Sequence, residues 1–419
     1  MGERIRPGLA SRLEYAGGWN QGPTQKFELE ISPEVEIELP FDMSLTAIGR
    51  ARGDGWDQLE RGHPSQKERS DASRRAATGD RLEAELRELY VAGDAGPLHF
   101  ILGKQQVVWG QADGLKVLDV VNPQSFREFI LRDFEDSRIP LWTANLEAAI
   151  GDWALQVLWI PDKTYHDFVG PENGGVFRFS APELVPVAPP GVEGRFRSTR
   201  RPGRFFEDSD AGARVKGFLF GWDVSVNYLY HYYDVPAFFA EVALTPTGPV
   251  ATVTPRYKRT HLVGATASNA FGDLAIRSEV AFSTDRYFTA DRGDGVAESE
   301  EFLYVLGLDW YGFRDSLVSF QLFQSVLTST NSGLIRDRVD TTFTLFAQRR
   351  FLHDTLKLEL IWLWNVNHGD GLVRPKVVYD WTDTISTWVG VDVFHGSRFG
   401  AFGQFDQADR AVVGMKWEI

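Results

Sequence analysis

Charged side chains are unusually dense between residues 113 and 138. Carboxylates alternate there with basic side chains, a mixture that can transfer protons, form ion pairs, or select solutes by its electric field. The charged residues considered for such roles are Asp113, Lys116, Asp119, Arg127, Arg132, Asp133, Glu135, Asp136 and Arg138. Within this segment, residues 127–136 hold six charges in ten positions, so no carboxylate pair stands out as an acid–base couple.

Signals for other chemistry are weak. The candidate histidines are spread over separate segments, namely His231, His261, His353, His368 and His395. The chain has no cysteine and no HExxH, GxSxG or phosphate-binding loop motif. Calcium binding by the acidic loops is a similarly weak alternative. The sequence therefore predicts no enzyme, no cofactor and no resident metal.

Composition narrows the class of protein. The net charge of −14 argues against a nucleic-acid partner. Thirteen Trp and thirty Phe accompany a mean hydropathy of −0.24, and no apolar run is long enough for a transmembrane helix. The N-terminal residues lack the apolar centre of a signal peptide. We expect either a protein that is not exported or a mature chain with an added start.

Alternation of apolar and polar residues predicts long strands. Residues 27–39 alternate over thirteen positions, with glutamates at most of the polar ones. Later segments repeat the pattern; Leu358 and Leu360, for example, oppose Lys357 and Glu359. Residues 81–91 are ambiguous between helix and strand, and we interpret them as a strand with a slip near Glu88.

Connections alternate between short turns and long loops. Tight turns such as 40–42, 151–152 and 272–273 are separated by polar loops. The long loops are 53–79, 107–138, 161–212, 234–251, 286–299, 331–337 and about 396–408. This order is typical of an up-and-down antiparallel meander of about 18 strands, with 16 also compatible. An even count places both termini on the short-turn side.

The strands decide between two all-β architectures. Soluble sandwiches and propellers use strands of about 5–6 residues, with aromatic residues in the core. The strands expected here run to about 10–14 residues with aromatic ends, as bilayer-spanning barrels require. The sequence favours a single transmembrane antiparallel up-and-down β-barrel over residues 1–419, with loop 107–138 folded inward and 161–212 as a long extracellular loop.

Two motif blocks resemble a known family. GKQQVVWGQADGLKVLDVVNP at 103–123 and FREFILRDFEDSRIPLW at 126–142 are similar to the Gram-negative outer-membrane family called domain of unknown function 1302; 221–236 and 272–282 fit the same pattern. The resemblance implies a porin-like outer-membrane barrel, with members often encoded beside RND-type exporters of hydrophobic molecules. It supplies no catalytic residue. The C-terminus departs from the usual terminal aromatic residue, because the chain ends Trp417-Glu418-Ile419.

The inward loop then acquires a role. Its charges, with wall residues Arg277, Glu279, Lys357 and Glu359, could form a pore constriction, or they could only hold a structural plug. We expect Arg127, Arg132 and Arg138 to pair with wall carboxylates such as Glu279 or Glu359. Expected partners are outer-membrane lipid and lipopolysaccharide and a hydrophobic or amphipathic small molecule, with both termini periplasmic. The alternative is a scaffold that holds a protein partner through its extracellular loops.

Overall fold

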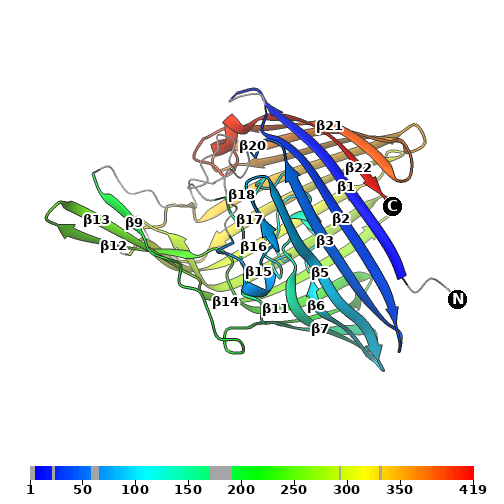
Figure 1. The fold of residues 1–419 in the computed structure, drawn as a ribbon, viewed down its shortest axis with the longest axis horizontal. Coiled ribbons are helices and arrows are strands. Elements are labelled where there is room, and N and C mark those ends of the chain that lie inside the picture. Colours follow the sequence, from blue (N-terminus) through cyan, green and yellow to red (C-terminus); the bar gives the residue numbers. More distant parts are fainter. Residues whose placement is uncertain (1–4, 21–23, 58–65, 170–190, 292–293, 330–332) are drawn as a thin grey trace.

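A computed structural model describes residues 5–20, 24–57, 66–169, 191–291, 294–329 and 333–419. Within these residues, eighteen antiparallel strands close into one barrel (Figure 1). Its strands are β1 (Ile5–Gly18), β2 (Lys26–Leu39), β3 (Met43–Asp54), β5 (Leu82–Ala95), β6 (Leu98–Gln105), β7 (Leu141–Ile150), β8 (Trp153–Ile160), β10 (Asp210–Leu219), β11 (Trp222–Tyr232), β14 (Arg259–Phe271), β15 (Leu274–Thr289), β16 (Val296–Trp310), β17 (Ser316–Leu327), β18 (Val339–Phe351), β19 (Leu356–Asn365), β20 (Asp370–Asp380), β21 (Ile385–His395) and β22 (Arg410–Glu418). The predicted fold class and the higher of the two strand counts are confirmed.

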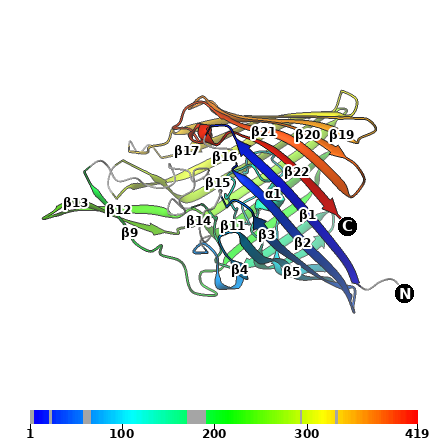
Figure 2. The same cartoon turned by 45° about the horizontal axis from the view of Figure 1, so that its top comes forward.

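Each strand of the barrel wall pairs with the next wall strand along the chain, and the first wall strand pairs with the last. The β1–β22 register runs from Ala10 opposite Glu418 to Gly18 opposite Arg410. Closure leaves no sheet edge, which satisfies the backbone hydrogen bonds of every wall strand. β1 begins and β22 ends at the short-turn end of the barrel (Figure 2).

The two faces of the wall differ as the alternation predicts. On β11, the side chain of Val226 is 59% exposed on the outside, whereas Asn227 is fully buried on the inside. On β19, Leu358 faces outward. Its neighbours Lys357 and Glu359 form an ion pair of 3.2 Å. The outer surface is therefore apolar and the interior polar, as a barrel in lipid requires.

Local departures from the sequence prediction have simple causes. Of the ambiguous residues 81–91, those from Leu82 onward are strand. The slip is a β-bulge: Ile48 pairs with Glu88 but Gly49 with Leu86, so Arg87 is the extra residue. The N-terminal β1, whose alternation is weak, completes the barrel.

The prediction of a polar loop over residues 234–251 is wrong. This segment contains most of a hairpin formed by β12 (Ala237–Thr245) and β13 (Gly248–Arg256). This hairpin and β9 (Glu193–Phe196), which belongs to segment 161–212, form a three-stranded sheet that projects from the long-loop end (Figure 1). Residues 170–190 of that segment lie outside the described residues.

Helical structure is sparse in the described part of the chain. It consists of α1 (Phe134–Ser137) and short 3-10 turns such as η1 (Asp71–Ser73) and η4 (Gly403–Ala408), and the two-residue strand β4 (Ala77–Thr78) pairs with β5. Among these residues, no helix is long and apolar enough to cross a membrane.

Candidate functional site: the insert inside the barrel

The segment between β6 and β7, residues 106–140, folds into the barrel interior, and we call it the insert. Its first half packs an apolar face on the inner wall, where Trp109, Val117 and Leu118 are buried. Their wall partners come from strands around the barrel: Leu158, Leu229, Leu262, Val305 and Phe323. Gly264 on β14 permits this approach, since a Cβ there would collide with the Leu118 side chain.

The second half of the insert packs against the loop before β22. Phe129 has a positive φ of 52°, and its ring centroid lies 4.8 Å from that of Phe405 in η4. Leu131 is buried in the same cluster with Leu363 and Phe394. Phe126, Ile130 and Phe134 are spaced in the sequence roughly as on one face of a helix, but the α-helix covers only Phe134–Ser137. The apolar side chains pack on different surfaces instead: Phe126 stacks on Phe168, whereas Phe129 packs on Phe405.

Glu128 is the centre of a buried ionic cluster that binds the insert to the wall. Its carboxylate accepts hydrogen bonds from Lys26 Nζ at 2.6 Å and from Arg410 Nη2 at 3.0 Å. Lys26 also contacts Glu14 at 2.7 Å, and Arg410 contacts Asp392 at 2.7 Å. The Glu128, Lys26 and Arg410 side chains are at most 2% exposed. Cations from β2 and β22 thus meet at one carboxylate of the insert, and carboxylates from β1 and β21 pair with the same two cations.

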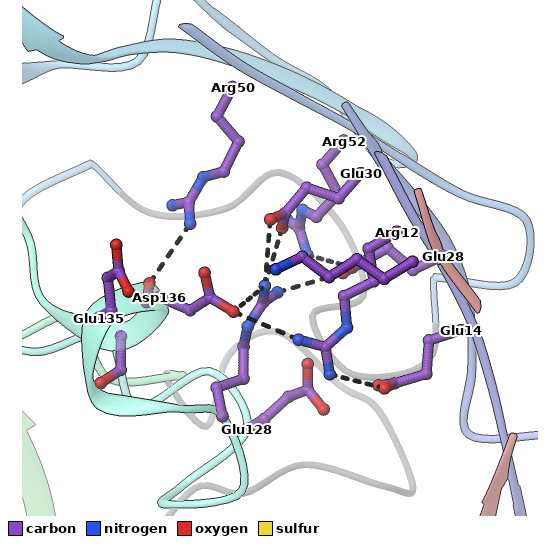
Figure 3. A network of polar contacts seen from close by, with 12 residues as sticks. Arg12, Glu14, Glu28, Glu30, Arg50, Arg52, Glu128, Glu135 and Asp136 are labelled. Atoms are coloured by element: carbon purple, nitrogen blue, oxygen red, sulfur yellow. Dashed lines mark hydrogen bonds and ion pairs between the residues drawn. The ribbon is translucent and has the colours of Figure 1, made fainter. Parts of the chain in front are cut away.

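A second group of ion pairs lies beside the first (Figure 3). Arg132 binds Glu30 at 3.0 Å and Asp136 at 3.2 Å, and Asp136 in turn binds Arg12 at 3.2 Å. Arg127 binds Glu28 at 2.7 Å. The network joins the insert to the glutamates of β2, which alternation places on the inner face.

The opposite wall holds the insert through backbone groups. Glu279 on β15 accepts hydrogen bonds from the N–H groups of Gln111, Ala112 and Leu118, the last two at 2.8 and 3.1 Å. Nearby, Arg277 binds Asp113 at 2.6 Å. Attachment on both sides means that the insert spans the interior.

Electrostatics explain why the buried insert charges persist. Burial opposes ionisation of Glu128, but Lys26 and Arg410 outweigh it and hold the pKa of that carboxyl well below its usual value. Burial likewise lowers the pKa of Lys116 to about 8, against the attraction of Asp119 at 2.6 Å. Glu128 is therefore ionised at neutral pH.

Two of the three insert arginines pair with wall carboxylates as expected, although not with Glu279 or Glu359. Arg127 and Arg132 bind β2 glutamates. Arg138 binds Asp119 of the insert itself at 2.7 Å. Glu279 receives N–H groups, and the group Lys357, Glu359 and Lys376 pairs within the wall. The strand facing the insert depends on barrel closure, which local sequence does not reveal.

Sequence reasoning missed the most deeply buried members of the site. Glu14, Lys26, Asp392 and Arg410 come from wall strands remote in sequence from the insert. Alternation could have placed Glu28 and Glu30 on the inner face, but it carries no signal for the Glu128 contacts.

Some carboxylates of the insert stay accessible to solvent. Asp133 and Glu135 are exposed, the Asp113 side chain is 60% exposed, and Asp136 is 32% exposed. By contrast, Lys116, Arg127, Arg132 and Arg138 are all at most 13% exposed and ion-paired. The accessible face of the insert is therefore acidic.

A closed barrel with an apolar exterior and a charged, partly filled interior is a β-barrel of the outer-membrane type. The chain belongs to the family described as "Protein of unknown function (DUF1302)", which matches residues 27–335, well over half of its length. No curated protein sequence matches it.

Solved structures of outer-membrane barrels share the fold. Pseudomonas aeruginosa OccK1 (OpdK) has 9% identity and a TM-score of 0.56, with 100% of this chain and 99% of that chain covered. Acinetobacter baumannii OccAB2 has 11% identity and a TM-score of 0.56, with 100% and 98% covered. P. aeruginosa OccK2 (OpdF), solved with glucuronate, has 8% identity and a TM-score of 0.55, with 100% and 98% covered. At these identities the likeness shows the fold alone.

Proposed function

We propose that this protein is a porin-like channel of the Gram-negative outer membrane, with residues 107–138 as its constriction. The observation that carries the proposal is the acidic, solvent-accessible face of an insert held inside a closed barrel. Water reaches Asp113 and Glu135 there, so aqueous space persists beside the insert. Outer-membrane barrels of this size hold either such a channel or a plugged lumen.

The orientation follows the usual plan of outer-membrane barrels. Short turns face the periplasm and long loops the outside in such proteins. We place both termini in the periplasm and segment 161–212 outside.

The accessible carboxylates define the permeant class. Cationic and neutral polar molecules should pass more readily than anions, because the exposed carboxylates of Asp133 and Glu135, which form no ion pair within the described residues, repel negative charge. The hydrophobic or amphipathic molecules expected from the family resemblance, handled with an RND-type exporter, fit this passage when they carry a polar or cationic end.

Deleting residues 113–136 tests the proposal. We expect single-channel conductance in planar bilayers to rise well above that of the intact protein, whose small currents should favour cations over anions. Heat-modifiable migration in gels would check that the deletion variant forms a barrel. A closed intact protein with a conducting deletion variant would assign the insert as a plug. Unchanged conductance, with cleavage of the insert by protease added from outside, would contradict both roles.

A further inference from the structure

A hollow of about 430 Å³ lies on the outer face of the barrel, away from the insert. It sits where β11, β14 and β15 end at the long-loop side, and its lining includes Tyr230, Tyr232, Lys258, Arg259, His261 and Tyr287. Tyr230 pairs with His261 across the β11–β14 ladder. Both therefore share the outward face with Val226, while Ser225 and Asn227 point inward.

Two cations line the hollow, and they differ in whether a carboxylate neutralises them. The Arg259 guanidinium lies 4.3 Å from the Tyr230 ring and 4.2 Å from the Tyr232 ring, and Asp210 neutralises it at 3.0 Å. The Lys258 ammonium lies 4.6 Å from the Tyr287 ring. Among the residues that the structure describes, no carboxylate pairs with Lys258. Its positive charge is therefore available to a ligand.

The position of the hollow along the barrel axis indicates which layer of the membrane it faces. Along β11, the exposed Val226 is followed by Tyr228, Tyr230 and Tyr232. Arg259, the first residue of β14, pairs with Tyr232, and Lys258 directly precedes Arg259 in the chain. Apolar, then aromatic, then cationic is the order in which a barrel meets acyl chains, the membrane interface and lipid phosphates. The volume falls in the range of small-ligand sites, about 300–1,000 Å³.

We propose that this hollow binds the phosphorylated sugar headgroup of an outer-leaflet glycolipid. Lys258 pairs with the phosphate, and the tyrosine rings pack on the sugar. Asp285, the carboxylate in the lining, accepts hydrogen bonds from the sugar hydroxyls. The inference rests on the proposed placement of the long loops outside the cell, but it does not depend on whether the barrel conducts.

Native mass spectrometry of the detergent-purified protein tests the site. The probes are a lipid A-core lipopolysaccharide, the same lipid after phosphatase treatment, and inorganic phosphate. We expect the phosphorylated lipid to bind. Lys258→Glu should lower the affinity for this lipid about tenfold, as the removal of a juxtamembrane cation should. Arg398→Glu is the matched control, because Arg398 is an exposed cation in another long loop. It should bind as the unaltered protein does.

Several outcomes would overturn the inference. Equal losses of lipid affinity in both variants would indicate a general charge effect. Equal binding of the dephosphorylated lipid would show that the site does not recognise the phosphate. Displacement of the lipid by inorganic phosphate at matched concentration would assign the hollow to a soluble anion. Heat-modifiable migration shows whether each variant forms a barrel. A channel test that fails while lipid binding succeeds would contradict the proposed function alone.

Discussion

Replacing Glu128 by glutamine should loosen the insert while keeping its shape. The substitution removes the one insert carboxylate that faces both Lys26, at 2.6 Å, and Arg410, at 3.0 Å. Glutamine can still accept one hydrogen bond, but it no longer compensates the two buried charges.

The structure sets the size of the effect. Removing one partner of a buried ion pair costs about 3–5 kcal/mol, because the other charge is left uncompensated. Lys26 keeps Glu14 and Arg410 keeps Asp392, each at 2.7 Å. We therefore expect a smaller cost of about 2–3 kcal/mol. This corresponds to a shift of roughly 30- to 140-fold in the equilibrium between attached and detached insert.

Single-channel recording measures this equilibrium. The Glu128→Gln variant should visit the high-conductance level of the 113–136 deletion variant more often by that factor. Glu135→Gln is the control, since it makes the same charge change on the same insert at an exposed side chain. It should shift the equilibrium by no more than about 0.5 kcal/mol. Equal opening frequencies in the two variants would refute the role of the buried cluster.

Two further predictions concern pH and the outer face. Because the pKa of Glu128 lies well below its ordinary 4.5, its contribution to attachment is present above that value and lost as pH falls through the depressed pKa. Insert openings should therefore not change between about pH 7 and pH 5 and should increase only in stronger acid; an increase already at pH 5 would contradict this. Leu360→Arg should destabilise the barrel in liposomes by about 2–4 kcal/mol, measured by tryptophan fluorescence in urea. Glu359→Gln, on the inner face, should mainly alter conductance, and equal destabilisation by the two changes would mean that the facing is wrong.

Some properties of this protein follow from sequence alone. Side chains of a strand alternate between two faces, so Leu358 and Glu359 had to lie on opposite sides of the wall. Turn signals at regular intervals predicted the strand ends and thereby the barrel. The insert was visible as a densely charged segment between two predicted strands.

The arrangement within the insert could not be read in the same way. Helical periodicity at Phe126, Phe129 and Phe134 came from side chains that pack on separate surfaces, not from one helix. An irregular segment has no period that links sequence position to direction, so its contacts depend on the walls around it.

Only the tertiary structure decided which charges meet. Lys26 and Arg410 lie near opposite ends of the chain, and they approach each other because β1 joins β22 and β2 when the barrel closes. Glu128 then meets both cations inside the barrel. Local sequence specifies the face on which each charge lies, whereas barrel closure and the path of the insert specify its partner.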